Sequence, residues 1–176
     1  MRPTIKISKL DAAKRQIETA LHLYFLSRDP VSIHTLTHAA YQILEDLNRH
    51  RGGKPMLMED MVEIYAKPEH KEDVYRKIHE AENFFKHADR DPEDTIDYCP
   101  QAAEMRLWEA CIKYTELSGE QTPIMQAMNG WFQIQHPNLF NYDDWRRDHL
   151  LSAHEFARRM SKEQYYQEFM KLKLRD

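Results

Sequence analysis

Glycine is scarce in this sequence, with four residues in a chain of 176. Tight hairpins and phosphate-binding loops depend on glycine, so its scarcity disfavours hairpin-rich sheets and nucleotide-binding enzymes of the familiar kinds. Cysteine is scarce too, and the two residues present, Cys99 and Cys111, are too few for a disulfide scaffold. We expect both thiols to be reduced.

Long apolar runs are also missing from the sequence. No stretch approaches the roughly 18 apolar residues that a membrane-spanning helix needs. Residues 1–6 carry positive charge but lack the apolar segment of a secretory signal. We therefore expect a cytoplasmic protein without a membrane partner.

What the chain does contain is charge in helical patterns. Charged residues make up 31% of the sequence and apolar residues 41%, and no segment alternates between apolar and polar over a useful length. Apolar residues recur instead at intervals of three and four, which is the spacing of amphipathic helices. The sequence predicts an all-α fold, a single-domain bundle of about six to eight helices over residues 1–176.

Helix boundaries are marked by capping residues. Ser8 and Asp11 have capping-box spacing, and Asp29 followed by Pro30 is a typical helix start. The first two helices are joined by a very short connection, so we expect the chain to open with an antiparallel helical hairpin whose second helix covers 30–48. Further helices are predicted at 58–66, 68–88 and 101–118, from Pro123, from about 144 and from Ser161, with one more helical turn starting at Asp91 and Pro92.

Three of these predictions concern burial. The helix at 58–66 is expected to turn Met61, Val62 and Tyr65 inward. The helix at 68–88 is expected to bury one apolar stripe, made of Val74, Ile78, Ala81, Phe85 and Ala88. The aromatic residues of the last helix, including Tyr166, are expected to dock onto the bundle, although aromatics beside basic residues would also suit single-stranded nucleic acid.

Histidine is the residue type most enriched in the chain, with ten copies. His34 and His38 are four residues apart, which places both imidazoles on one face of a helix, as in half of a metal site. A third ligand would come from His79 or His87. The alternative interpretation is that these are polar, half-exposed histidines beside the buried stripe.

A second group of polar residues lies on the helix at 68–88. At 100° per residue, Arg76, His79, Asn83 and His87 share an arc of about 80° on the side away from the apolar stripe. Such a row could bind phosphate or share protons, and it could equally be a solvated helix face. The sequence has no nucleophile elbow and no glycine-rich phosphate loop, and no cofactor is predicted.

The opening segments, residues 10–15 and 39–44, resemble the first two helices of HEPN domains. These are small helical bundles of prokaryotic toxins, abortive-infection systems and RNA-processing proteins, and active members cleave RNA without a metal. The motif of that family is an arginine, often followed by asparagine, with a histidine four to six residues after the arginine. Residues 82–87 are similar to it in Asn83 and His87, but Glu82 stands in the place of the arginine.

This difference at Glu82 bears on the activity that the resemblance implies. A carboxylate would repel the phosphate that an arginine holds, so Arg76 or Lys86 would have to supply the positive charge. The resemblance therefore implies an RNA- or nucleotide-associated protein with His87, Asn83 and Arg76 as the candidate catalytic residues.

Two alternatives from other functional classes remain open. The first is a non-catalytic interaction module that forms a homodimer through its methionine- and aromatic-rich helices. The second is a metal-dependent helical-bundle enzyme with His34, His38 and His79 as candidate metal ligands.

Overall fold

Helices account for all regular structure in the residues that this computed structural model describes, which are 2–89, 92–141, 143–157 and 159–173. Within those residues there is no strand, and the all-α prediction is confirmed. The helices are α1 (Lys9–Phe25), α2 (Pro30–His50), α3 (Leu57–Tyr65), α4 (Lys71–Lys86), α5 (Ala102–Ser118), α6 (Pro123–Gln135), α7 (Asp144–Ala157) and α8 (Lys162–Lys173). Two 3₁₀ turns, η1 (Pro68–His70) and η2 (Pro137–Leu139), separate some of them.

The predicted caps form at several helix starts. The backbone N–H of Asp11 donates to Ser8 Oγ, and the N–H of Ser8 donates back to the Asp11 carboxylate, both at 3.0 Å. Asp29 accepts from the N–H of Ser32 at 2.7 Å and starts α2 one residue before Pro30. These contacts pair backbone donors that a helix start would otherwise leave unpaired.

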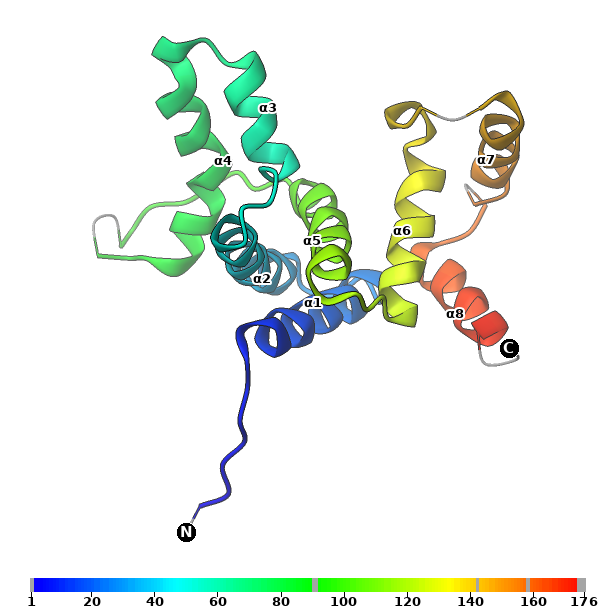
Figure 1. Ribbon diagram of the computed structural model, residues 1–176, viewed down its shortest axis with the longest axis horizontal. Helices are drawn as coiled ribbons and strands as arrows, with labels where there is room; N and C mark the ends of the chain where they lie inside the picture. The colour runs from blue at the N-terminus through cyan, green and yellow to red at the C-terminus, as the bar shows by residue number, and fades with distance from the viewer. Residues whose placement is uncertain (1, 90–91, 142, 158, 174–176) are drawn as a thin grey trace.

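The hydrophobic core lies among α1, α2, α5 and α6, which cross at the centre of the molecule in Figure 1. Phe25, Leu44, Leu107 and Met125 are all fully buried and come from these four helices in turn. α1 and α2 share the most extensive contact between any two helices of the described chain, while their antiparallel course stays a prediction.

The last helix packs its aromatic residues onto this core. The Tyr166 ring stacks on Phe25 with a centroid separation of 4.8 Å and an interplanar angle of 11°. Tyr165 lies 5.1 Å from Trp131 of α6, also between ring centroids. These contacts bear out the docking of α8 that the sequence predicts.

α3 and α4 project from one side of this core as an arm, and α4 packs against α2 (Figure 1). The apolar stripe predicted on α4 is less deeply buried than expected. Val74, Ile78, Ala81 and Phe85 are only half-buried, and Ala88 is exposed because the helix ends at Lys86. A helix that touches the bundle along one edge cannot bury its apolar side chains completely.

The predicted burial on α3 also needs correction. Val62 is buried as expected, but Met61 and Tyr65 are 45% and 78% exposed. The helix packs against α4 over a narrow face, so most of its apolar side chains remain at the surface.

The helical turn that was expected directly after α4 does not form in the described residues. Asp91, where a helical turn was expected to start, lies outside the described residues, and residues 92–93 form a turn. Residues 94–99 follow without helical structure, which corrects the predicted helix start. This irregular segment brings Tyr98 back to α2.

The sequence predicts no membrane-spanning segment. Among the described residues, none of the helices combines the length and the hydrophobicity needed to cross a bilayer.

Candidate metal centre

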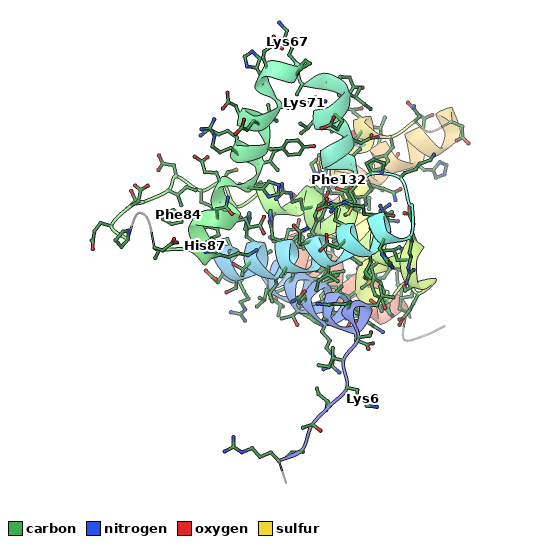
Figure 2. The ribbon with its side chains drawn as sticks, turned by 60° about the vertical axis from the view of Figure 1, so that its left-hand side comes forward. Lys6, Lys67, Lys71, Phe84, His87 and Phe132 are labelled. Carbon is green, nitrogen blue, oxygen red and sulfur yellow. The ribbon has the colours of Figure 1, made fainter. Side chains whose placement is uncertain are left out.

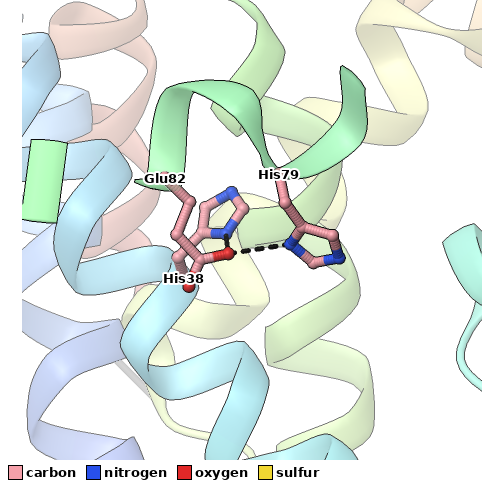
Figure 3. Close-up of side chains that lie close together, drawn as sticks. All are labelled: His38, His79 and Glu82. Atoms are coloured by element: carbon pink, nitrogen blue, oxygen red, sulfur yellow. Dashed lines mark hydrogen bonds and ion pairs between the residues drawn. The ribbon is translucent and has the colours of Figure 1, made fainter. Parts of the chain in front are cut away.

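Two histidines and a glutamate meet at the contact between α2 and α4. His38 comes from the middle of α2, while His79 and Glu82 lie three residues apart on α4 (Figure 3). Both Nδ1 atoms are 2.9 Å from the same carboxylate oxygen, Glu82 Oε2. One potential ligand atom from each residue lies within 4.8 Å of the other two. We call these three residues the His38–His79–Glu82 cluster.

The carboxylate of this cluster is largely shielded from solvent. The Glu82 side chain is 11% exposed, and Lys86, one helical turn later, forms an ion pair with its other oxygen, Oε1. The hydrogen bonds from His38 and then from His79 hold the pKa of the Glu82 carboxyl far below its usual range. Glu82 is therefore ionised at neutral pH.

The imidazole of His38 is buried and electrically neutral at pH 7. His38 is 3% exposed, and this burial is the main cause that lowers its pKa. The ring donates its Nδ1 proton to Glu82, which leaves Nε2 as an acceptor. One guanidinium nitrogen of Arg106, from α5, lies within hydrogen-bond distance of both ring nitrogens of His38, and in this tautomer its N–H donates to Nε2.

Arg106 is a buried cation, with 5% of its surface exposed. Its other guanidinium nitrogen lies 3.3 Å from the carbonyl oxygen of Ile78, and the guanidinium carbon lies 5.6 Å from the centre of the Tyr41 ring. Arg106 thus connects α5 to both α2 and α4. Its positive charge also contributes to the lowered pKa of His38.

A cavity of about 260 Å³ adjoins the cluster, and we call it the smaller cavity. His34, His38, Tyr98, Cys99 and Arg106 are among the residues that line it. The ring of His34 stacks on that of His38 with centroids 4.1 Å apart, and its Nδ1 lies 3.1 Å from the Tyr98 hydroxyl. Burial lowers the pKa of His34 from 6.5 to about 4, so this ring is also neutral at pH 7.

The candidate metal ligands of the sequence fall into place in part. His38 and His79 do meet, although they lie on different helices. His34 stacks on His38 but is not one of the three residues whose ligand atoms converge, and Glu82 takes that position. The prediction that His34 and His38 are half-exposed is wrong, because both are only 3% exposed.

The candidate catalytic residues lie elsewhere. Arg76, Asn83 and His87 all line a second, larger cavity of about 680 Å³. His87 lies just past the end of α4, beside the segment that follows (Figure 2), and Arg76 forms an ion pair with Asp73. The arc that was expected to hold four polar residues is therefore divided, since His79 turns towards Glu82.

Glu82, Arg106 and Tyr98 are site residues that the sequence did not indicate. Glu82 lies three residues after His79, which is the one local signal that could have suggested it. Arg106 occurs among apolar residues of α5 and resembles an ordinary surface arginine in sequence. Tyr98 lies in an irregular segment that has no periodicity to interpret.

Chemically, the cluster offers the ligand types that a first-row divalent ion takes. Neutral imidazole and ionised carboxylate are zinc ligands in catalytic sites, where three protein ligands leave a position for water or substrate. No proton has to be removed from a histidinium at pH 7, since His38 is already neutral. The donor types and the mutual distances of the three side chains are those of a candidate metal site.

The buried His34 generates a prediction for stability against pH. Its pKa is lower in the folded chain than in the unfolded chain, so between pH 6.5 and about 4 the unfolded chain binds more protons. The stability is complete above pH 6.5 and is lost as the pH falls. We expect His34→Gln to remove about 1–2 kcal/mol of the loss in unfolding free energy between pH 7 and pH 5.

The measurement is urea unfolding at the two pH values, with a chelator present. His70→Gln is the control, because His70 is exposed and is solvated in both states. An equal pH dependence in wild type and His34→Gln would show that His34 is not buried in its neutral form.

Comparisons with protein-family models, with curated proteins and with solved structures found no match to this chain.

Proposed function

We propose that this protein is a metal-dependent helical-bundle enzyme that holds one first-row divalent ion, of the zinc type, with His38, His79 and Glu82. The observation that carries the proposal is the convergence of two imidazole Nδ1 atoms on one carboxylate oxygen, each at 2.9 Å.

The distances within the cluster are close to those of a metal site. In a tetrahedral zinc site with bonds of about 2.0–2.1 Å, neighbouring ligand atoms are about 3.4 Å apart. Each 2.9 Å hydrogen bond therefore has to lengthen by roughly half an ångström when an ion replaces the two Nδ1 protons. Side-chain rotations of His79, which is 35% exposed, allow that change.

The position of the smaller cavity supports catalysis over a purely structural role. Three protein ligands leave at least one coordination position open, and His38 lines the cavity next to the cluster. An ion held there would act as a Lewis acid and would lower the pKa of a bound water. None of the three cluster residues belongs to the hydrophobic core among α1, α2, α5 and α6, so we expect the bundle to fold without the ion.

Two cations next to the cluster affect how tightly an ion binds. Lys86 already pairs with Glu82 Oε1, and Arg106 donates to His38 Nε2. When an ion takes His38 Nδ1, the ring proton moves to Nε2, and the Arg106 N–H has to change partner. We expect these adjustments to make the ion removable by chelators while the protein stays folded.

Metal binding is the first test of the proposal. Untagged protein, treated with chelator and then dialysed against Zn²⁺, Co²⁺ or Mn²⁺, is expected to retain about one ion per chain by elemental analysis. His79→Gln and Glu82→Gln should weaken the affinity about 10- to 100-fold, because each removes a ligand.

His87→Gln provides the matched control, since His87 is an exposed histidine near the same helix end that lines the larger cavity. Wild-type affinity in this variant supports the assignment. An ion content well below one per chain, or an equal loss in all three variants, would contradict it.

An RNA- or nucleotide-associated function of the HEPN type is the second candidate. It is supported by the larger cavity, which Arg76, Asn83 and His87 line together. Three carboxylates, those of Glu80, Asp89 and Asp94, line the same cavity and oppose a phosphate there. Because these carboxylates repel a phosphate, the larger cavity supports an RNA- or nucleotide-associated function less strongly than the cluster supports metal binding.

Fluorescence anisotropy with labelled single-stranded RNA, together with a gel-based cleavage assay, tests this candidate. If it holds, His87→Ala lowers RNA affinity or cleavage at least 10-fold, while His79→Gln has no effect. Equal behaviour of wild type and His87→Ala would remove it.

Self-association into a homodimer stays a prediction. It is favoured by a row of exposed apolar side chains on α3, with helical spacing and exposures of 41% to 78%: Leu57, Met61, Ile64 and Tyr65.

A further inference from the structure

One of the residues that line the smaller cavity, His34, carries a buried nitrogen without a partner in the described chain. His34 is 3% exposed and lines this cavity, and its Nε2 has no hydrogen-bond partner in the part of the chain that the structure describes. An unpaired polar atom in such a place costs about 1–3 kcal/mol. A folded protein tolerates that cost most readily where a ligand removes it.

The contact with Tyr98 indicates which kind of ligand atom is missing. The Tyr98 hydroxyl lies 3.1 Å from His34 Nδ1 and can donate its proton to that nitrogen. In this tautomer the neutral imidazole carries its own proton at Nε2. The unpaired atom is then an N–H donor, and its partner is an acceptor such as an oxygen.

Arg106 gives the same cavity a positive charge. Arg106 is 5% exposed and contacts the ring of His38. That ring stacks on the ring of His34, which carries the unpaired nitrogen, with centroids 4.1 Å apart. The carboxylate of Glu82 is already shared by two histidines and Lys86.

The charges at the entrance of the cavity weigh less than Arg106. Lys77 and Glu80 are exposed and pair with each other, and Asp97 is exposed as well. Exposed charges are screened by solvent and salt, whereas a buried guanidinium acts at short range and low dielectric. The interior of the cavity thus favours an anion.

The volume of the cavity limits the size of that anion. At roughly 30 Å³ per water molecule, about 260 Å³ holds a ligand of about eight or nine non-hydrogen atoms. A nucleotide or an RNA strand would have to extend out of the cavity. A small carboxylate or phosphate fits.

We propose that the smaller cavity binds a small oxyanion, a carboxylate or a phosphate group, with one oxygen on the Nε2–H of His34 and another on the guanidinium of Arg106. A role of this cavity as a substrate site rests on the proposed function. His38 belongs to the cluster and also lines the cavity, so an ion bound by the cluster would lie next to the oxyanion. Oxyanion binding itself needs no metal.

The two sites are also coupled through His38. Metal at Nδ1 places a proton on Nε2, which then no longer accepts from Arg106. The Arg106 N–H turns to another acceptor, and an oxyanion in the cavity is one. The metal-loaded protein therefore binds the oxyanion more tightly than the metal-free protein, and by linkage the oxyanion tightens metal binding by the same factor.

The test is titration of untagged protein with inorganic phosphate in one arm and acetate in the other, by calorimetry and by ¹⁵N NMR of the histidine rings. Both arms are run in chelator-treated and in zinc-loaded protein, in buffer free of other oxyanions. Saturable binding of at least one anion is expected, with a shift of the His34 Nε2 resonance. The arm that binds identifies the class of oxyanion.

Variants separate this site from other causes of binding. Arg106→Gln should weaken the binding at least 10-fold, and Tyr98→Phe should weaken it several-fold by removing the hydroxyl that orients His34. Lys67→Gln, an equal change of net charge at the exposed tip of the α3–α4 arm, should change it less than twofold (Figure 2). If Arg106→Gln fails to fold, Tyr98→Phe and the His34 resonance still decide the question.

Three results would overturn the inference. They are no saturable binding of either anion, unchanged binding in Arg106→Gln and Tyr98→Phe, and binding that leaves the His34 resonance unmoved. A metal that binds without any oxyanion would leave the proposed function standing and remove only this inference. Oxyanion binding in a protein that takes up no metal would do the reverse.

Discussion

The carboxylate of Glu82 is the contact on which the arrangement of the arm depends. α4 buries no side chain completely, so hydrophobic burial alone attaches it weakly to the bundle. Its firm connections to the bundle are polar: Glu82 accepts from His38 of α2, and Arg106 of α5 lies within reach of the Ile78 carbonyl. A buried ionised group with several partners is costly to separate from them. The residues that hold the arm are therefore the same residues that could hold an ion.

This overlap explains why the charges around the cluster look unusual for a structural contact. A helix is ordinarily attached by apolar side chains, which need no exact partner and tolerate substitution. Here one carboxylate, two imidazoles and two cations occupy the contact between α2, α4 and α5. Such a network satisfies its members only in one arrangement, so it restricts the geometry more than packing would. A restricted geometry is what a binding site needs.

The fold was predictable from the sequence because its determinants are local. The caps at Ser8 and Asp29 and the spacing of apolar residues define where the first helices begin and which face is buried. Depth of burial is not local. The apolar stripe on α4 was identified correctly as the inner side, but its half-burial depends on how α4 meets α2, and nothing within residues 71–86 records that.

The site shows the same limit more sharply. His38 and His79 could be named as ligand candidates because histidine is enriched and has few other roles in a helix. Their meeting on Glu82, and the approach of Arg106, depend on contacts between helices that are far apart in sequence. The predicted row from Arg76 to His87 assumed a helix that continues past Lys86, whereas the helix ends there and His87 leaves the row.

X-ray absorption spectroscopy of the zinc-loaded, untagged protein shows which atoms bind the ion. If His38, His79 and Glu82 are the ligands, the first shell contains nitrogen and oxygen only, at about 2.0–2.2 Å, with outer-shell scattering from two imidazole rings. That scattering should fall to one ring in His79→Gln. A sulfur ligand at about 2.3 Å, which would point to Cys99, or a spectrum without imidazole scattering would exclude these three residues as the ligand set.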